Sequence, residues 1–316
     1  MEGRIKLGIS SCLLGEKVRY DGGHKLNHFL TDTLGRYIEW VPVCPEVECG
    51  LPIPREAMRL AGTPESHRLV TIKAGIDHTE RMLKWAGKKL IELEKADLCG
   101  FVFKSRSPSS GMRGVKIYTA SGMPSRTGSG IFAKAFMEQF PLMPVEDEGR
   151  LNDPQLRENF VERIFVMKRW QEFKKGRCSI RNLGSFHTSI KLLVLSHSPK
   201  HYAQLGRLVA NAQDAPIQEL YNGYFRSLME GLSLIATVKK NTNVLQHIMG
   251  YFKKQLSADE KQELSEWIAD YHRGLIPLIV PLSLIRHYVR KYQEPYLQTQ
   301  YYLNPHPLEL MLRNHV

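Results

Sequence analysis

The chain has 316 residues, more than the roughly 100–200 of a usual domain, so two domains are expected. Its apolar fraction of 42% is ordinary, the N-terminal residues lack a signal-peptide pattern, and the most apolar segment, 275–285, is too short to span a bilayer. We therefore expect a soluble, cytoplasmic protein. The net charge of +12 and the pI near 9.4 favour a polyanionic partner, although many intracellular proteins are simply basic.

The first half of the chain alternates short apolar segments with amphipathic ones. Strands are expected at 5–9, 40–43, 68–74, 100–103 and 143–145, and helices at 26–37, 79–98, 131–140 and 154–175. This alternation predicts an α/β N-terminal domain with a mostly parallel sheet. The last of these helices ends in a basic run, KKGR at 174–177, and we place the end of the first domain at residue 175.

From about residue 185 the strand signals fade and helical periodicity dominates. Helices are expected at 187–195, 199–212, 216–234, 241–255, 258–273 and 280–292. Ser257 and Glu260 have the spacing of a capping box at the start of the fifth of these helices. The sequence therefore predicts an all-α C-terminal domain over residues 176–316.

Three of the expected strands run directly into conspicuous loops. Cys12 follows the first strand, Cys44 follows the second, and a loop rich in serine, 104–112, follows the strand at 100–103. The carboxyl ends of parallel strands meet at one edge of a sheet, where ligands commonly bind. We therefore expect these loops to form the walls of one site.

Five cysteines, an odd and scattered set without a CxxC pair, disfavour a disulfide framework and a zinc ribbon. By spacing alone, Cys12 and Cys44 are either buried core thiols or ligands that only the fold brings together.

Several motifs in order resemble those of the thiouracil desulfidase family. They are SCLLG at 11–15 with RYDG at 19–22, VCPE at 43–46 with GLP at 50–52 and PR at 54–55, and SPSxG at 107–111. The resemblance covers residues 1 to about 165. It implies an α/β domain in which three cysteines hold a 4Fe-4S cluster, whose fourth iron takes the sulfur of a thiolated pyrimidine while water supplies the replacing oxygen.

The second half resembles the helical domain that is fused to this desulfidase domain in many bacteria. The motifs are LGRLVAN at 205–211, NVLQHIMGYFKK at 243–254 and YLNPHP at 302–307. This architecture is similar to that of RNA-acting desulfidases, which convert 4-thiouridine in tRNA to uridine. The resemblance thus implies tRNA as the partner.

Carried over residue by residue, the resemblance makes Cys12 and Cys44 cluster ligands and places the third ligand at Ser110. A serine oxygen is a poor substitute for a thiolate toward iron in such clusters. Ser110 has three explanations: the ligand was removed by engineering, the chain belongs to a natural branch of the family that recruits another cysteine, or the cluster has been lost. Cys49 could reach the same pocket, whereas Cys99 and Cys178 are expected to be a buried core thiol and an incidental one.

Glu46 and Ser107 match the positions that assist catalysis in the family. Water must lose a proton as it attacks the ring, so Glu46 is the expected base and Ser107 is expected to orient it or the pyrimidine carbonyl. The alternatives are a solvated loop carboxylate and a turn serine. Asp21, His24 and Arg55 could shape the site or touch the substrate, although Asp21 before two glycines is usually structural.

Basic residues of the linker and the helical half could contact RNA phosphates rather than read a base sequence. Singly, each is more often a solvated charge, and Tyr288 and Tyr292 are interleaved with the last three. The set is Lys174, Lys175, Arg177, Lys253, Lys254, Arg286, Arg290 and Lys291.

The leading hypothesis is therefore a 4Fe-4S-dependent desulfidase that converts 4-thiouridine in tRNA to uridine and is disabled here if Ser110 cannot replace the third ligand. The alternative is a cluster-less RNA-binding protein with a degenerate desulfidase domain. A nucleotide-binding α/β enzyme is less well supported, because no phosphate loop of the usual spacing occurs in the sequence.

Overall fold

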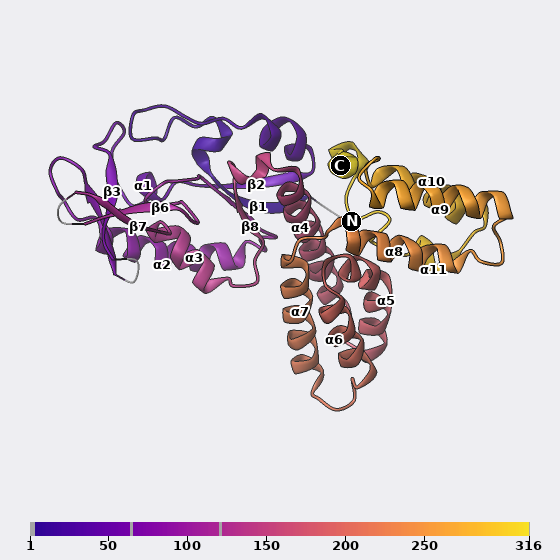
Figure 1. Cartoon of the computed structure of the whole chain (residues 1–316). Coiled ribbons are helices and arrows are strands. Elements are labelled where there is room, and N and C mark those ends of the chain that lie inside the picture. Colours follow the sequence, from indigo (N-terminus) through magenta and orange to yellow (C-terminus); the bar gives the residue numbers. More distant parts are fainter. Residues whose placement is uncertain (1–3, 64–65, 120–121, 316) are drawn as a thin grey trace. The chain divides into compact units, whose positions relative to one another are not determined.

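The computed structural model describes residues 4–63, 66–119 and 122–315. The chain divides into two compact units, Met1–Asp153 and Pro154–Val316 (Figure 1). The helix α4 (Pro154–Lys175) therefore belongs with the second unit, so the boundary lies earlier than expected. The reason is aromatic packing, because the Trp170 ring of α4 stacks on Tyr224 and Phe225 at centroid distances of 5.7 and 5.2 Å.

The first unit is built on a parallel four-stranded sheet in the order β2-β1-β5-β8. This confirms the predicted α/β domain with a mostly parallel sheet. The strands alternate along the chain with α1 (Pro45–Glu48), α2 (Thr79–Lys95) and α3 (Ile131–Gln139). The strands are β1 (Ile5–Ser10), β2 (Ile38–Val43), β5 (Phe101–Phe103) and β8 (Val145–Asp147).

An aromatic core joins this sheet to its helices. Phe101 and Phe103 of β5 pack against Phe132 and Phe136 of α3, and all four side chains are at most 1% exposed. Gly8 of β1 faces this core. A Cβ atom there would lie 2.1 Å from the Phe101 ring, so only glycine lets the strand and the ring approach so closely.

The strand expected at 68–74 does not join the parallel sheet. It forms β4 (His67–Thr71), which pairs antiparallel with β3 (Met58–Gly62) in a second sheet of order β4-β3-β6-β7. The other members, β6 (Val115–Tyr118) and β7 (Pro124–Gly128), were not predicted. These strands are short and interrupted by polar residues, and their pairing is decided by partners distant in sequence.

The helix expected at 26–37 is also irregular in the structure. A π-helical turn (Phe29–Thr33) is followed by a 3₁₀ turn (Leu34–Arg36). The Asn27 side chain accepts a hydrogen bond from the Leu30 amide at 3.1 Å and so fixes the start of this segment. Apolar spacing does not distinguish an α-helix from tighter and wider turns.

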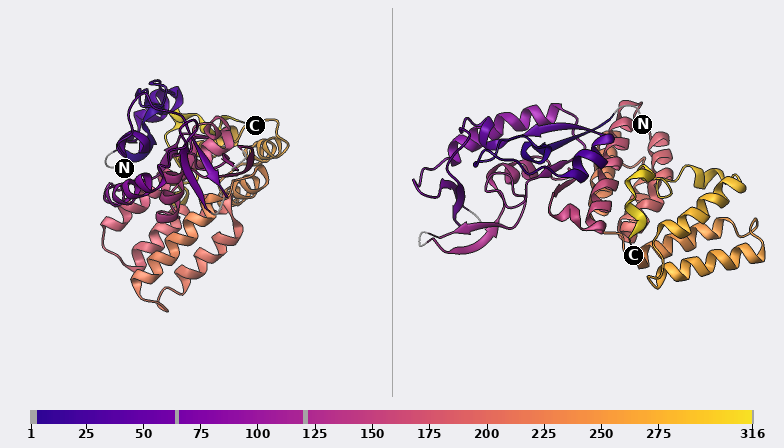
Figure 2. Two further views of the ribbon diagram at one scale, coloured as in Figure 1. Left: turned by 90° about the vertical axis from the view of Figure 1, so that its left-hand side faces the viewer. Right: turned by 90° about the horizontal axis from the view of Figure 1, so that it is seen from above.

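The second unit is helical, as predicted, and its helices are seen from two further directions in Figure 2. Ser257 and Glu260 form the expected capping box. Within the described ranges, no helix is long and apolar enough to cross a membrane. After α4 follow α5 (Ile180–His197), α6 (Pro199–Ala210), α7 (Ile217–Ser233), α8 (Val238–Tyr251), α9 (Ala258–His272), α10 (Ile279–Lys291) and α11 (Pro295–Gln298).

Candidate active site

A cavity of about 200 Å³ lies at the carboxyl ends of β1, β2 and β5. The strand order places β2 and β5 on opposite sides of β1, so the chain adds strands first on one side of β1 and then on the other. Such a switch point is where open α/β sheets bind ligands. The three loops expected to form one site do so, because Cys12, Cys44, Glu46, Ser107 and Ser110 all line the cavity.

The loop after β5 is held in a tight turn. The Gly111 amide donates to the Ser107 carbonyl at 2.8 Å, and a Cβ atom on Gly111 would lie 2.7 Å from that carbonyl oxygen. The Ser107 hydroxyl oxygen accepts from the amides of Ser109 and Ser110 at 3.3 and 3.1 Å. These bonds hold the turn whose residues Ser107, Ser109 and Ser110 line the cavity.

The two thiols of the cavity are shielded from solvent. Burial raises the pKa of Cys12 to about 11, and nearby Cys44 adds to the rise, whereas Lys104 and Arg19 oppose it. Burial also raises the pKa of Cys44, whose thiol points to the Val18 carbonyl at 3.9 Å. Both groups are therefore thiols at neutral pH, and a metal would have to displace their protons to bind.

Ser110 occupies the third position expected for a cluster ligand. Its side chain is 4% exposed and lines the same cavity as the two thiols. In the part of the chain that the structure describes, no group of three or more His, Cys, Asp or Glu side chains is placed to hold a metal ion. Two thiols and a hydroxyl do not fit a cluster held by three thiolates.

The other cysteines do not complete this set. Cys49 lines a separate surface pocket beside Arg81 and Trp85, and its thiol donates to the Glu46 carbonyl at 3.2 Å. Cys99 is 1% exposed in the core, as expected, and Cys178 is an exposed residue of the second unit.

Glu46 is the centre of a polar chain that crosses the cavity wall. Arg55 Nε donates to Glu46 Oε2 at 2.8 Å, and the Ser109 hydroxyl donates to Oε1 at 2.8 Å. The Ser107 and Ser109 hydroxyl oxygens lie 3.0 Å apart. Because Ser109 gives its proton to Glu46, Ser107 must donate to Ser109. Ser107 therefore orients Glu46 through an intervening serine.

Arg55 also joins two of the loops. Its Nη2 atom donates to the Val18 carbonyl at 3.0 Å, and its amide donates to the Tyr20 carbonyl at 2.8 Å. The Arg55–Glu46 ion pair is buried, with side chains 5% and 13% exposed. From the sequence, Arg55 was expected to shape the site or touch the substrate, and Ser109 was not singled out. The sequence features that could have pointed to them are the arginine of the PR motif at 54–55 and the serine-rich loop at 104–112.

A second pair braces the loop after β5. Lys104 forms an ion pair with Glu148, a residue that follows β8, and the Ser105 amide donates to Glu148 Oε2 at 2.7 Å. The Lys104 amide donates to Ser10 Oγ at 2.9 Å, which ties the loop to the end of β1. Lys104 thus supplies a positive charge near Cys12 while the sheet holds it in place.

The open side of the cavity carries Arg19 and Tyr20. Tyr20 is 43% exposed, and the Arg19 guanidinium lies 5.4 Å from its ring centroid. Flat surfaces of this kind suit a heterocyclic base. Asp21 accepts from the Gly23 amide at 3.0 Å and is a turn residue, and His24 accepts from the Leu26 amide at 3.2 Å.

The residues predicted to contact RNA differ in whether their charged groups are already paired with other groups of the chain. Arg286 is tied to the Leu303 carbonyl through Nε at 2.9 Å, and burial lowers its pKa to about 10. Lys291 pairs with Glu260 at 2.6 Å, and the interleaved Tyr288 is 2% exposed. RNA contact by the set stays a prediction. Its exposed members are Lys174, Lys175, Arg177, Lys253, Lys254, Arg290 and Lys291.

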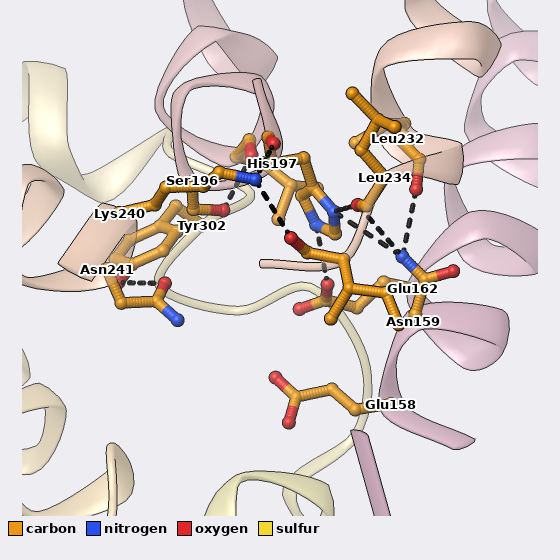
Figure 3. A network of polar contacts seen from close by, with 12 residues as sticks. Glu158, Asn159, Glu162, Ser196, His197, Leu232, Leu234, Lys240, Asn241 and Tyr302 are labelled. Atoms are coloured by element: carbon orange, nitrogen blue, oxygen red, sulfur yellow. Dashed lines mark hydrogen bonds and ion pairs between the residues drawn. The ribbon is translucent and has the colours of Figure 1, made fainter. Parts of the chain in front are cut away.

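The helical unit contains its own buried polar network (Figure 3). Glu162 of α4 accepts from Arg313 at 2.6 Å and meets His197 Nε2 at 3.0 Å. His197 Nδ1 lies 2.7 Å from the Leu234 carbonyl oxygen, to which it donates a hydrogen bond. The adjoining cavity of about 40 Å³ has room for little more than water. This network is a structural link between helices.

The fold and the cavity together define the class of the protein. An α/β domain places two thiols, a braced carboxylate and a serine-rich loop at the switch point of a parallel sheet, and an all-helical unit follows. This is the arrangement of a cysteine-containing α/β enzyme domain with a helical partner domain.

Comparisons with known proteins identify both units. The family described as 2-thiouracil desulfurase matches residues 7–148, and the protein family of unknown function DUF1722 matches residues 191–307. The uncharacterized protein YbgA of Escherichia coli (strain K12) is 34% identical over 153 residues, which are 48% of this chain and 90% of YbgA. The uncharacterized protein YbbK of Bacillus subtilis (strain 168) is 32% identical over 151 residues, 46% of this chain and 97% of YbbK.

A solved structure, the 4Fe-4S-dependent thiouracil desulfidase TudS, is 27% identical, with 48% of this chain and 95% of that chain covered at a TM-score of 0.39. The chain belongs to the 2-thiouracil desulfurase family through its first unit, which is fused to a DUF1722 domain.

Proposed function

We propose that the chain binds a thiolated uridine of tRNA in the cavity at the switch point, and that its catalytic domain is that of a tRNA 4-thiouridine desulfidase. The observation that carries the proposal is the convergence of Cys12, Cys44, Glu46, Ser107 and Ser110 on one cavity in a chain of the desulfurase family. The reaction consumes one water and replaces the C=S group by C=O, with release of hydrogen sulfide.

The wall of the cavity supplies the base for this reaction. Glu46 is held by Arg55 and by the Ser107–Ser109 pair, so one carboxylate oxygen is oriented by the guanidinium and the other by a hydroxyl. A fixed carboxylate can take the proton of an attacking water without the free-energy cost of reorienting its side chain during the reaction. Arg19 and Tyr20 on the open side would pack against the pyrimidine ring.

The cofactor proposed for this family domain is a 4Fe-4S cluster, with Cys12, Cys44 and the residue at position 110 as its ligands. Because Ser110 leaves the set one thiolate short, we propose that the chain is deficient in the cluster and therefore in sulfur removal. Ser110 is also the observation that favours the second candidate function, a cluster-less protein that binds RNA without chemistry.

Replacing the proposed base tests the catalytic role of Glu46. In a chain that carries Ser110→Cys and has been reconstituted with iron and sulfide, Glu46→Gln should lower the rate of 4-thiouridine loss from tRNA by about 10²- to 10⁴-fold. The amide keeps the shape and the contact to Ser109 but cannot take a proton. Nucleoside chromatography of the digested tRNA gives the rate.

Glu39→Gln is the matched control, because Glu39 is an exposed carboxylate of the same unit, and its ion pair with exposed Lys6 is long, at 3.8 Å. It should leave the rate unchanged. Equal rates for Glu46→Gln and the parent chain would refute the proposed base.

RNA binding can be tested without catalysis. Association of tRNA with the full chain should weaken with rising salt, because bound phosphates release counterions. Lys253→Ala should weaken binding and reduce the slope of log K against log salt by about 1. Lys291→Ala should have a smaller effect, since Glu260 already pairs with that lysine. Binding that is independent of salt would contradict a phosphate-contacting partner.

A further inference from the structure

The second sheet of the first unit buries one face and leaves the other beside a groove. Leu60 of β3 and Ile117 of β6 are fully buried against α2 and α3, and the two residues are paired in register. Side chains alternate along a strand, so Arg59, Lys116 and Tyr118 lie on the opposite face. All three line a groove of about 790 Å³ over the strands β3, β6 and β7, which are labelled in Figure 1.

The groove is positively charged. The described residues that line it include the three cations Arg59, Arg106 and Lys116 and no carboxylate. Lys116 and Arg106 are exposed. The Arg59 Nε atom is shielded from solvent and has no hydrogen-bond partner among the described residues. A donor left unsatisfied in this way is completed at little cost by an anionic or carbonyl oxygen.

An aromatic surface accompanies these charges. The Arg59 guanidinium lies 5.3 Å from the centroid of the Tyr118 ring, so the two groups present a flat pair on the outer face of the sheet. Cations interleaved with an aromatic face are the arrangement that binds unpaired nucleic acid, because the cations meet phosphates and a base stacks on the flat surface.

The groove adjoins the candidate active site. Arg106 and Pro108 line both the groove and the cavity that contains Cys12. Arg106 has a left-handed backbone with a φ of +58°, a conformation that costs free energy for a residue other than glycine. This conformation occurs where the loop after β5 leaves the cavity and turns toward β6.

We infer that this groove binds the nucleotides that flank the thiolated base in an unpaired RNA segment. Arg106 and Lys116 contact the phosphates, and the Arg59–Tyr118 pair stacks on a neighbouring base. The inference rests on the proposed function, because the cavity takes the thiolated base itself. A base can enter the cavity only when it leaves its stack, so its neighbours need a surface of their own. The N-terminal unit then binds RNA as well as the helical one.

The inference is tested by binding of two probes to the full chain, a short single-stranded RNA that contains one 4-thiouridine and the free nucleoside 4-thiouridine. Fluorescence anisotropy of labelled RNA gives its affinity, and calorimetry gives that of the nucleoside. Lys116→Glu should weaken RNA binding and lower its salt slope by at least about 1. Tyr118→Ala should weaken it by about 5-fold or more, and Tyr118→Phe should retain most of the affinity. Nucleoside binding should not change.

Lys95→Glu is the matched control, because Lys95 is an exposed lysine at the last turn of α2 in the same unit. It should leave the affinity for RNA nearly unchanged, and thermal melting checks that each variant is folded. The inference is overturned if Lys116→Glu and Tyr118→Ala bind RNA like the parent chain, or if they weaken the nucleoside equally. A parent chain that binds no RNA would instead refute the proposed function, and the groove inference with it.

Discussion

Ser110→Cys should convert the chain into one that holds an iron–sulfur cluster. After anaerobic reconstitution, the variant should contain close to four iron and four sulfide per chain, the stoichiometry of a 4Fe-4S cluster, and the parent chain far less. The reason is the donor set, since the change places a third thiol in the cavity that Cys12 and Cys44 already line. Metal and sulfide analysis, with the absorption spectrum, measures the outcome.

Two further variants make this test specific. Cys12→Ala in the Ser110→Cys background should abolish the cluster, whereas Cys49→Ala should retain it, because Cys49 lines a different pocket. A parent chain with a full cluster would show that Ser110 or another donor completes the site. If no variant holds iron, the cofactor proposed for this domain is wrong, and the cluster-less RNA-binding alternative gains support.

The second large effect is expected in the buried network of the helical unit. Glu162→Gln should lower the free energy of unfolding of this unit by about 3 kcal/mol, because it removes the buried carboxylate that pairs with both Arg313 and His197. All three side chains are at most 3% exposed, so water cannot replace the lost charge. Denaturant titration gives the stability, and hydrogen exchange in α4 and α5 locates the effect.

Glu158→Gln provides the contrast within the same network. Burial, with help from Glu162, raises the pKa of Glu158, so in the folded unit its proton is held to higher pH than in the unfolded chain. Ionisation of Glu158 therefore opposes folding as pH rises past the usual carboxyl range. Glu158→Gln, which places a neutral amide there, should lower the free energy of unfolding by less than about 1 kcal/mol or raise it.

The two carboxyl groups should also differ in their pH dependence. Burial alone would raise the pKa of Glu162, but Arg313 and His197 outweigh it and hold the pKa below its usual range. The stability that Glu162 contributes is therefore present above the usual carboxyl pKa and is lost as pH falls through the lower folded value. Equal effects of the two substitutions at neutral pH would contradict this division of charge.

The boundaries of most long helices followed closely from the sequence, although α5 (Ile180–His197) begins well before the expected residue 187. The helix predicted at 154–175 is α4, and the capping box at Ser257 begins α9 as expected. Such signals are local, since a cap and an apolar stripe lie within a few turns of each other. The site loops were also predictable, because a cysteine or a serine-rich segment directly after an apolar strand must lie at the strand's carboxyl end.

The pairing of short strands was not predictable in the same way. β4 looks like any buried strand in sequence, and its place in the second sheet depends on β3 and, through β3, on β6. The groove with Arg59 and Tyr118 therefore had no local signal. The domain boundary was misplaced for the same reason, because Trp170 finds its stacking partners on α7, about fifty residues further along the chain.

The sequence by itself determined which residues stand at the ends of the strands, including the thiols Cys12 and Cys44 and the serine at position 110. Only the tertiary structure decided which groups the functional residues contact. Arg55 and Ser109 bind Glu46, Cys49 lines a separate pocket, and Arg286 donates to a backbone carbonyl. The physical reason is that a side chain's charge and reactivity depend on burial and on neighbours brought from distant positions, which no local pattern encodes.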